Sequence, residues 1–286
     1  MDEQPAYTER RFTCQDGLGF YFRDYGDTTS SAMPVVYLTG LTRNSKDFDG
    51  LARRLAPTRR VLSPDDRGRG RSNIDANWRR YHPRTYIDDL RHLLVVNNIH
   101  EAVLVGTSMG GIVAAGLAVG APTLVAGVVL NDVGPTLDPK GIQNIVDYVR
   151  DTRTQPNWKA AVRHLKDTLP DRPATSDDGW LAIARATYRE QDDGTLHVDW
   201  DPNLVKPMLE LGTETLDLWP LFGALGDVPT VVIRGARSDV LSGKTLAAMK
   251  ERWPAMTTVT IDDVGHASSL GEPAAVSAID DLLARV

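Results

Sequence analysis

The stretch from Ala102 to Val119 constrains the fold most, because its pattern predicts a buried strand joined to a helix through a sharp turn around one serine. Residues 102–105 are short, apolar and partly β-branched, which is typical of a strand buried on both faces. The turn reads Gly-Thr-Ser-Met-Gly over residues 106–110, and the alanine-rich residues 112–119 suit a helix. Glycines two positions either side of Ser108 relieve the crowding of such a turn. The pattern predicts a serine hydroxyl raised above the sheet, with backbone N–H groups aimed at the same point.

Strand-like and helix-like segments alternate through the rest of the chain. Residues 10–13 and 18–24 flank Gln-Asp-Gly and predict a hairpin. Strands that alternate with helices indicate an α/β fold with a mostly parallel sheet covered on both faces. Further buried strands are predicted at 35–38, 60–63, 127–130, 230–233 and 257–261, and helices at 45–55 (with Ser45 as the cap), 85–97, one ending near 253, and one beginning at 272.

The strands at 127–130 and 230–233 are too far apart to be joined by a simple crossover helix. Helices are expected from Asp138-Pro139, from Asn157 and over about 176–190, each with an apolar face. We therefore expect a helical insertion at 135–220 between two parts of one α/β core, 1–134 and 221–286.

Composition narrows the class of protein. The 286 residues have a hydrophobic content of 42% and a net charge of −6, which argues against nucleic acid as the main partner. A single cysteine, Cys14, excludes an internal disulfide framework and a multi-cysteine zinc site. The acidic N-terminus lacks the apolar core of a signal peptide, and no apolar run approaches a membrane span. We expect a cytoplasmic protein with neither nucleic acid nor membrane as a partner.

A serine hydroxyl needs a base to take its proton and a further group to orient that base. Of six histidines, only His266 lies just past the carboxyl end of a predicted strand, at the sheet edge where Ser108 is expected. Two aspartates end strands at the same edge, Asp239 after 230–233 and Asp132 after 127–130. We prefer Asp239 as the orienting acid and keep Asp132 as its competitor.

These features together resemble the α/β-hydrolase superfamily, and in particular its serine esterases and lactonases with a helical cap. The resemblance rests on Gly106-x-Ser108-x-Gly110, on Asp239 and His266, and on a loop similar to the Asp-x-Arg-Gly-x-Gly-x-Ser stretch of esterase, lactonase and C–C hydrolase members. That loop contains the run Asp66-Arg67-Gly68-Arg69-Gly70-Arg71-Ser72.

The resemblance implies a Ser108–His266–Asp239 triad in an eight-stranded core, with a cap at 135–220 and no cofactor or metal. It also implies an oxyanion hole formed by the backbone N–H groups of Leu41 and Met109. Many relatives carry His-Gly where this chain has Thr39-Gly40, and a threonine cannot make the hydrogen bonds of an imidazole. The conformation of that loop is therefore left open.

A serine at the turn implies acyl transfer through an acyl-enzyme. The substrate is expected to be a small or medium carboxylic ester or a lactone, and no bound cofactor is needed. The same three residues would serve a C–C bond hydrolase of vinylogous diketones, and a non-catalytic ligand-binding member of the fold is a third reading. Arg43 is expected either to meet a substrate carboxylate or to pair with a nearby aspartate such as Asp66. A homodimer is expected only because two-fold assemblies are common.

Overall fold

The computed structural model describes residues 6–169, 176–211 and 217–286. An eight-stranded sheet runs through its centre in the order β1-β2-β4-β3-β5-β6-β9-β10. The hairpin β1–β2 is antiparallel, β2 pairs antiparallel with β4, and the strands from β4 to β10 are parallel to one another. The α/β-hydrolase fold predicted from the sequence is confirmed. The strands are β1 (Tyr7–Thr13), β2 (Gly19–Tyr25), β3 (Val35–Leu38), β4 (Val61–Asp65), β5 (Ala102–Thr107), β6 (Val125–Asn131), β9 (Thr230–Gly235) and β10 (Thr257–Ile261).

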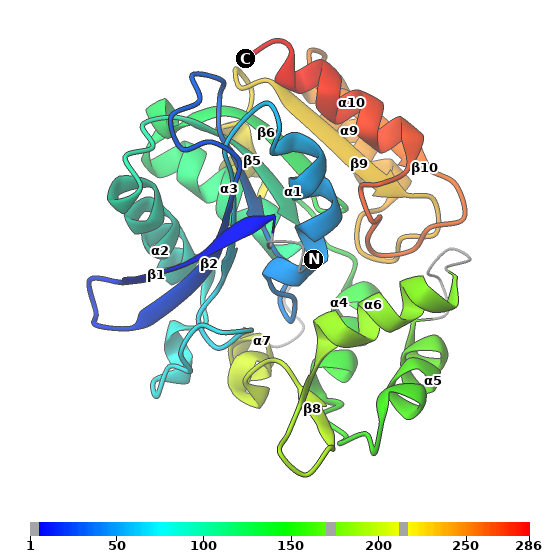
Figure 1. Cartoon of the computed structure of the whole chain (residues 1–286). Helices are drawn as coiled ribbons and strands as arrows, with labels where there is room; N and C mark the ends of the chain where they lie inside the picture. The colour runs from blue at the N-terminus through cyan, green and yellow to red at the C-terminus, as the bar shows by residue number, and fades with distance from the viewer. Residues whose placement is uncertain (1–5, 170–175, 212–216) are drawn as a thin grey trace.

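Both faces of the sheet are covered, because alternate apolar residues of the buried strands point to opposite sides (Figure 1). One core cluster joins the sheet to α2 (Pro83–Val96), α3 (Met109–Gly120), α8 (Trp219–Gly223) and α9 (Gly243–Arg252). A second joins the opposite face to α1 (Asp49–Leu55) and α10 (Pro273–Leu283). The parallel strands therefore end at one common edge, which places the loops after β3, β5, β6, β9 and β10 side by side.

Between β6 and β9 the chain leaves the sheet and forms a separate group of elements, visible together below the sheet in Figure 1. Three predicted helices are present, and Asp138, Asn157 and Ser176 cap them with their side chains. The predicted end of the third helix, near residue 190, is wrong, because the chain turns at Tyr188 into a two-stranded hairpin. The elements are α4 (Pro139–Arg150), α5 (Trp158–Thr168), α6 (Asp177–Thr187), β7 (Tyr188–Glu190), β8 (Leu196–Val198), the 3₁₀ turn Pro202–Val205 and α7 (Lys206–Leu211).

This inserted segment has a small core of its own, built from α5, α6 and the hairpin. Trp180 and Tyr188 belong to that core, whereas Trp200 packs with the main core and lies against Tyr148 with ring centroids 5.8 Å apart. These aromatic side chains therefore hold the segment together and attach it to the sheet domain. Its function as a cap, and its limits at 135 and 220, stay predictions.

Two local details differ from the sequence expectation or add to it. The helix expected from Ser45 begins as a 3₁₀ turn, Ser45–Phe48, and the side chain of Asn44 rather than that of Ser45 caps it. No helix within the described residues is long and apolar enough to cross a membrane.

Candidate active site

Ser108 lies in the turn between β5 and α3 with a backbone φ of 53° and ψ of −117°. The two glycines that flank it leave no room for a side chain. A Cβ at Gly106 would lie 2.5 Å from the Gly110 carbonyl group, and a Cβ at Gly110 would lie 2.2 Å from the Leu38 carbonyl oxygen. The steric function assigned to the glycines is confirmed, and the turn holds a half-buried serine at the carboxyl edge of the sheet.

His266 follows β10 and brings its ring against Ser108. Its Nε2 lies 3.0 Å from the serine Oγ, and its Nδ1 lies 2.6 Å from Oδ2 of Asp132. With the proton on Nδ1, the imidazole donates to the carboxylate and leaves Nε2 free to accept the serine proton. The Asn131 side chain donates to the Ser268 carbonyl at 2.9 Å and so fixes the loop that carries the histidine. This arrangement can activate a serine hydroxyl as a nucleophile.

The expectation that Asp239 contacts the histidine is wrong, and Asp132 occupies that position. Asp132 follows β6 in a left-handed conformation (φ 57°), and its side chain is fully buried. The carboxylate accepts from the Gly235 N–H at 3.0 Å and from the Ser238 hydroxyl as well as facing His266. Three hydrogen-bonding partners around one buried carboxylate fix its position.

Asp239 lies in the turn after β9 but points away from the histidine. Its carboxylate accepts a hydrogen bond from the Asn144 side chain on α4 at 2.6 Å. Helix α4 packs so closely here that a Cβ at Gly141 would lie 2.1 Å from the Asp239 carbonyl oxygen. The inserted segment therefore holds the Asp239 side chain, while the neighbouring Ser238 donates a hydrogen bond to Asp132, just after β6.

The loop after β3 lies where the second oxyanion donor was expected. A Cβ on Gly40 would lie 3.8 Å from the Ser108 Cβ, so the loop passes directly beside the serine. The Gly40 carbonyl accepts from the Arg43 N–H at 3.1 Å, which turns the opposite end of that peptide, the Leu41 N–H, outward. Thr39 closes the loop through its hydroxyl, which donates to the Arg43 carbonyl at 3.1 Å. The Thr39 hydroxyl thus holds the loop by this hydrogen bond. An imidazole at the same position need not make it.

The two proposed oxyanion donors are placed to be free for a ligand. The Leu41 N–H has no acceptor within the described residues. Met109 is the first residue of α3, where helical N–H groups lack an intrahelical partner. That these groups bind an oxyanion remains a prediction.

Arg43 does not pair with Asp66. Its guanidinium makes two hydrogen bonds of 2.6 Å to Asp47 and a third, of 2.7 Å, to the Thr187 hydroxyl at the end of α6. Arg43 therefore pairs with a nearby aspartate, as one of the two interpretations predicted, but that aspartate is Asp47, four residues along the chain. The bond to Thr187 also ties the loop after β3 to the inserted segment.

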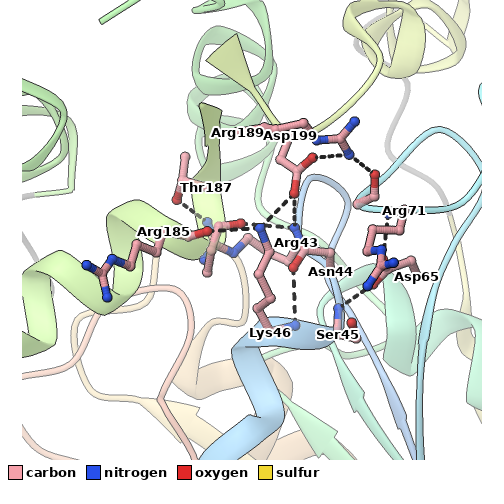
Figure 2. A network of polar contacts seen from close by, with 12 residues as sticks. Arg43, Asn44, Ser45, Lys46, Asp65, Arg71, Arg185, Thr187, Arg189 and Asp199 are labelled. Carbon is pink, nitrogen blue, oxygen red and sulfur yellow. Dashed lines mark hydrogen bonds and ion pairs between the residues drawn. The ribbon is translucent and has the colours of Figure 1, made fainter. Parts of the chain in front are cut away.

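Figure 2 shows this link as part of a wider network between the two parts of the molecule. The carboxylate of Asp199, at the end of the β7–β8 hairpin, lies 2.7 Å from the Lys46 ammonium and 2.6 Å from the Arg189 guanidinium. Asn44 donates both to this carboxylate and to the Ala186 carbonyl. Because these partners come from both sides, the network fixes the inserted segment on the loop after β3.

The loop after β4 contains a largely buried carboxylate, Asp66, whose side chain is 16% exposed. Burial raises the pKa of Asp66 to about 6, and the Arg69 guanidinium, 3.8 Å away, only partly offsets that effect. In the unfolded chain the group titrates near 4. The folded state therefore holds this proton more tightly, and the contribution of Asp66 to stability falls as the pH rises from about 4 to about 6.

We expect Asp66→Asn to stabilise the protein above pH 7 by about 1–3 kcal/mol, because the amide removes the cost of burying a charge. The gain should be smallest at pH 4, where the wild-type carboxyl is protonated in the folded state and about half protonated in the unfolded chain. Urea unfolding of both proteins at pH 4, 6 and 8 measures the difference. A gain that is equal at all three values would contradict the assignment of the raised pKa to Asp66.

Within the described residues, no group of three or more histidine, cysteine, aspartate or glutamate side chains is arranged to hold a metal ion. Cys14 is buried, and burial raises the pKa of its thiol, so it is not a reactive thiolate at neutral pH.

Known proteins resemble the chain over nearly its full length. The family model described as "Alpha/beta hydrolase family" matches residues 35–279. A 3-hydroxybutyrate-oligomer hydrolase from Cupriavidus necator is 31% identical, over 90% of this chain and 89% of the relative. Lipase LipV from Mycobacterium tuberculosis is 34% identical, over 92% and 96%. A crystal structure of an alpha/beta hydrolase from Novosphingobium aromaticivorans superposes with a TM-score of 0.92 at 40% identity, covering 99% of this chain and 100% of that one.

Proposed function

Because the chain belongs to the α/β-hydrolase family, we propose that it is a serine hydrolase that cleaves small or medium carboxylic esters or lactones. The observation that carries the proposal is the continuous line of hydrogen bonds from Ser108 through His266 to Asp132. The relatives support an enzyme of this family. In this proposal Asp132 takes the place in the triad that the sequence assigned to Asp239.

In the first half of the reaction, the Ser108 Oγ attacks the ester carbonyl carbon and its proton passes to His266 Nε2. The carbonyl oxygen becomes an oxyanion between the N–H groups of Leu41 and Met109. The intermediate then expels the alcohol, which takes the proton from the imidazolium, and an acyl-serine remains. Asp132 keeps the imidazole in the correct tautomer and stabilises its positive form.

In the second half, His266 removes a proton from a water molecule, which attacks the acyl carbon. The second tetrahedral intermediate releases the carboxylic acid and returns the proton to Ser108. Every proton transfer uses the same Nε2, so no cofactor or metal is needed. Within the residues that the structure describes, the buried Asp132 carboxylate faces the ring and supports this cycle.

The name of the Cupriavidus relative favours esters of short hydroxy acids among the candidate substrates. We therefore propose to assay p-nitrophenyl esters of two to twelve carbons, 3-hydroxybutyrate dimer and trimer, a γ-lactone, and a coloured vinylogous diketone. Turnover of esters with a chain-length optimum would support the proposal. Loss of colour from the diketone without ester hydrolysis would instead favour the C–C hydrolase.

A fluorophosphonate probe tests the nucleophile without reference to the substrate. It should label the folded protein once, and peptide mapping should place the label on Ser108. Stoichiometric binding of an ester without turnover, together with failure to label, would contradict an enzyme and favour a ligand-binding protein.

A further inference from the structure

Arg69 has an unusual position for a charged side chain. It follows Gly68 in the loop after β4, and its side chain is fully buried. The nearest carboxylate within the described residues is that of Asp66, at 3.8 Å, which is beyond hydrogen-bond distance. Burying an arginine without a carboxylate at hydrogen-bond distance is costly, which raises the question of what the guanidinium does there.

Two of the contacts of the Arg69 guanidinium are with residues beside the nucleophile. Its Nε donates to the Leu41 carbonyl, in the loop after β3. Its Nη2 lies 3.7 Å from the Met109 sulfur, at the start of α3. These are the residues whose N–H groups are proposed to bind the oxyanion, so a single side chain contacts both residues, through the carbonyl of one and the side chain of the other.

The guanidinium itself is rigidly held. It lies over the Tyr86 ring, 4.8 Å from the centroid, and donates to the Tyr86 hydroxyl at 3.1 Å. Nη1 donates to the Arg67 carbonyl at 3.2 Å. A planar group fixed on three sides can hold a loop peptide in one orientation, which a flexible lysine cannot do equally well.

We propose that Arg69 is a positioning residue that fixes the Leu41–Thr42 peptide, and through it the adjoining Leu41 N–H, and keeps a positive charge behind the proposed oxyanion hole. To stabilise the oxyanion, the Leu41 N–H must be held within a few tenths of an ångström of its hydrogen-bonding position. The Gly40–Arg43 turn orients this peptide from one side, and the Arg69 bond to the Leu41 carbonyl anchors the next peptide from the other. This inference rests on the proposed function and assigns to it a residue outside the triad.

The test compares Arg69→Met, Arg69→Lys and a matched control, Arg71→Met. Arg71 lies two residues along the same loop, but its half-exposed side chain pairs with Glu9 at the surface. For Arg69→Met we expect kcat on a p-nitrophenyl ester to fall about 10- to 100-fold with KM within about threefold, since oxyanion stabilisation acts on the transition state. Arg69→Lys should recover part of the loss, and Arg71→Met should behave as wild type.

Labelling by the fluorophosphonate provides a second readout. Phosphonylation of Ser108 develops charge on the phosphonyl oxygen, at the place that the ester's carbonyl oxygen takes in the proposed oxyanion hole. We expect the labelling rate of Arg69→Met to fall in parallel with kcat. Thermal melting identifies a variant that fails to fold; if Arg69→Met does so, the same comparison is made with Arg69→Lys, whose kcat should still lie below that of Arg71→Met.

The outcomes separate the inference from the proposed function. A folded Arg69 variant with wild-type kcat and labelling rate would overturn the positioning role and leave the hydrolase proposal intact. A rise in KM alone would also overturn it, because that result indicates a role in substrate binding. If wild type neither turns over esters nor reacts with the probe, the hydrolase proposal fails, and the role of Arg69 falls with it.

Discussion

Replacement of Ser108 by alanine is expected to lower kcat for ester hydrolysis by at least about 10,000-fold. No other group in the site can form the acyl-enzyme, so only transition-state binding by the remaining groups would persist. Alanine keeps the Cβ at this strained position (φ 53°), and the fold should therefore be unaffected. Initial rates at high enzyme concentration, with a detection limit below the expected residual activity, measure the effect.

The matched control is Ser269→Ala. Ser269 is an exposed serine three residues after His266, and its hydroxyl donates to Glu272 and accepts from the Gly271 N–H, with no contact to the triad. It should keep wild-type activity and probe labelling. Hydrolysis by Ser108→Ala at more than about one hundredth of the wild-type rate would contradict an acyl-serine mechanism and indicate that water is activated directly.

The second large effect is expected at Asp132. Asp132→Asn should lower kcat by about 1,000- to 10,000-fold, because an amide in place of the carboxylate favours the wrong imidazole tautomer and no longer stabilises the imidazolium. The shape of the side chain is nearly unchanged. Steady-state kinetics, with circular dichroism to verify folding, measure the loss.

Asp239→Asn is the paired variant, and its activity should stay within about twofold of wild type. Its carboxylate contacts Asn144 on α4 and not the histidine. The reverse result, a large loss at Asp239 and little at Asp132, would show that the enzyme works in an arrangement different from this structure. Equal small losses would mean that His266 needs no orienting acid.

Much of the fold and part of the site follow from local sequence patterns. The apolar run at 102–105, the two glycines around Ser108 and the helix behind them have local physical causes, since only such residues fit a strand, a strained turn and a helix in succession. The β1–β2 hairpin and the caps at Asp138 and Asn157 are equally local. His266 could be chosen because it alone follows a strand at the correct edge.

The acid could not be chosen in the same way. Asp132 and Asp239 both follow Ser108 and precede His266 in the chain, and both end parallel strands at that edge. Neither chain order nor strand position distinguishes them. Likewise, the pairing of Arg43 with Asp47, the hairpin after α6 and the burial of Arg69 depend on contacts between segments far apart in sequence or on packing around them.

The sequence by itself determined which residues reach the edge of the sheet, because strand, turn and helix signals act over a few residues. Only the tertiary structure decided which carboxylate turns inward. Packing of α4 against the Asp239 turn leaves that side chain facing Asn144, while the Gly235 N–H and the Ser238 hydroxyl hold Asp132 beneath the histidine. Side-chain direction at a strand end is set by such long-range contacts, which no local pattern encodes.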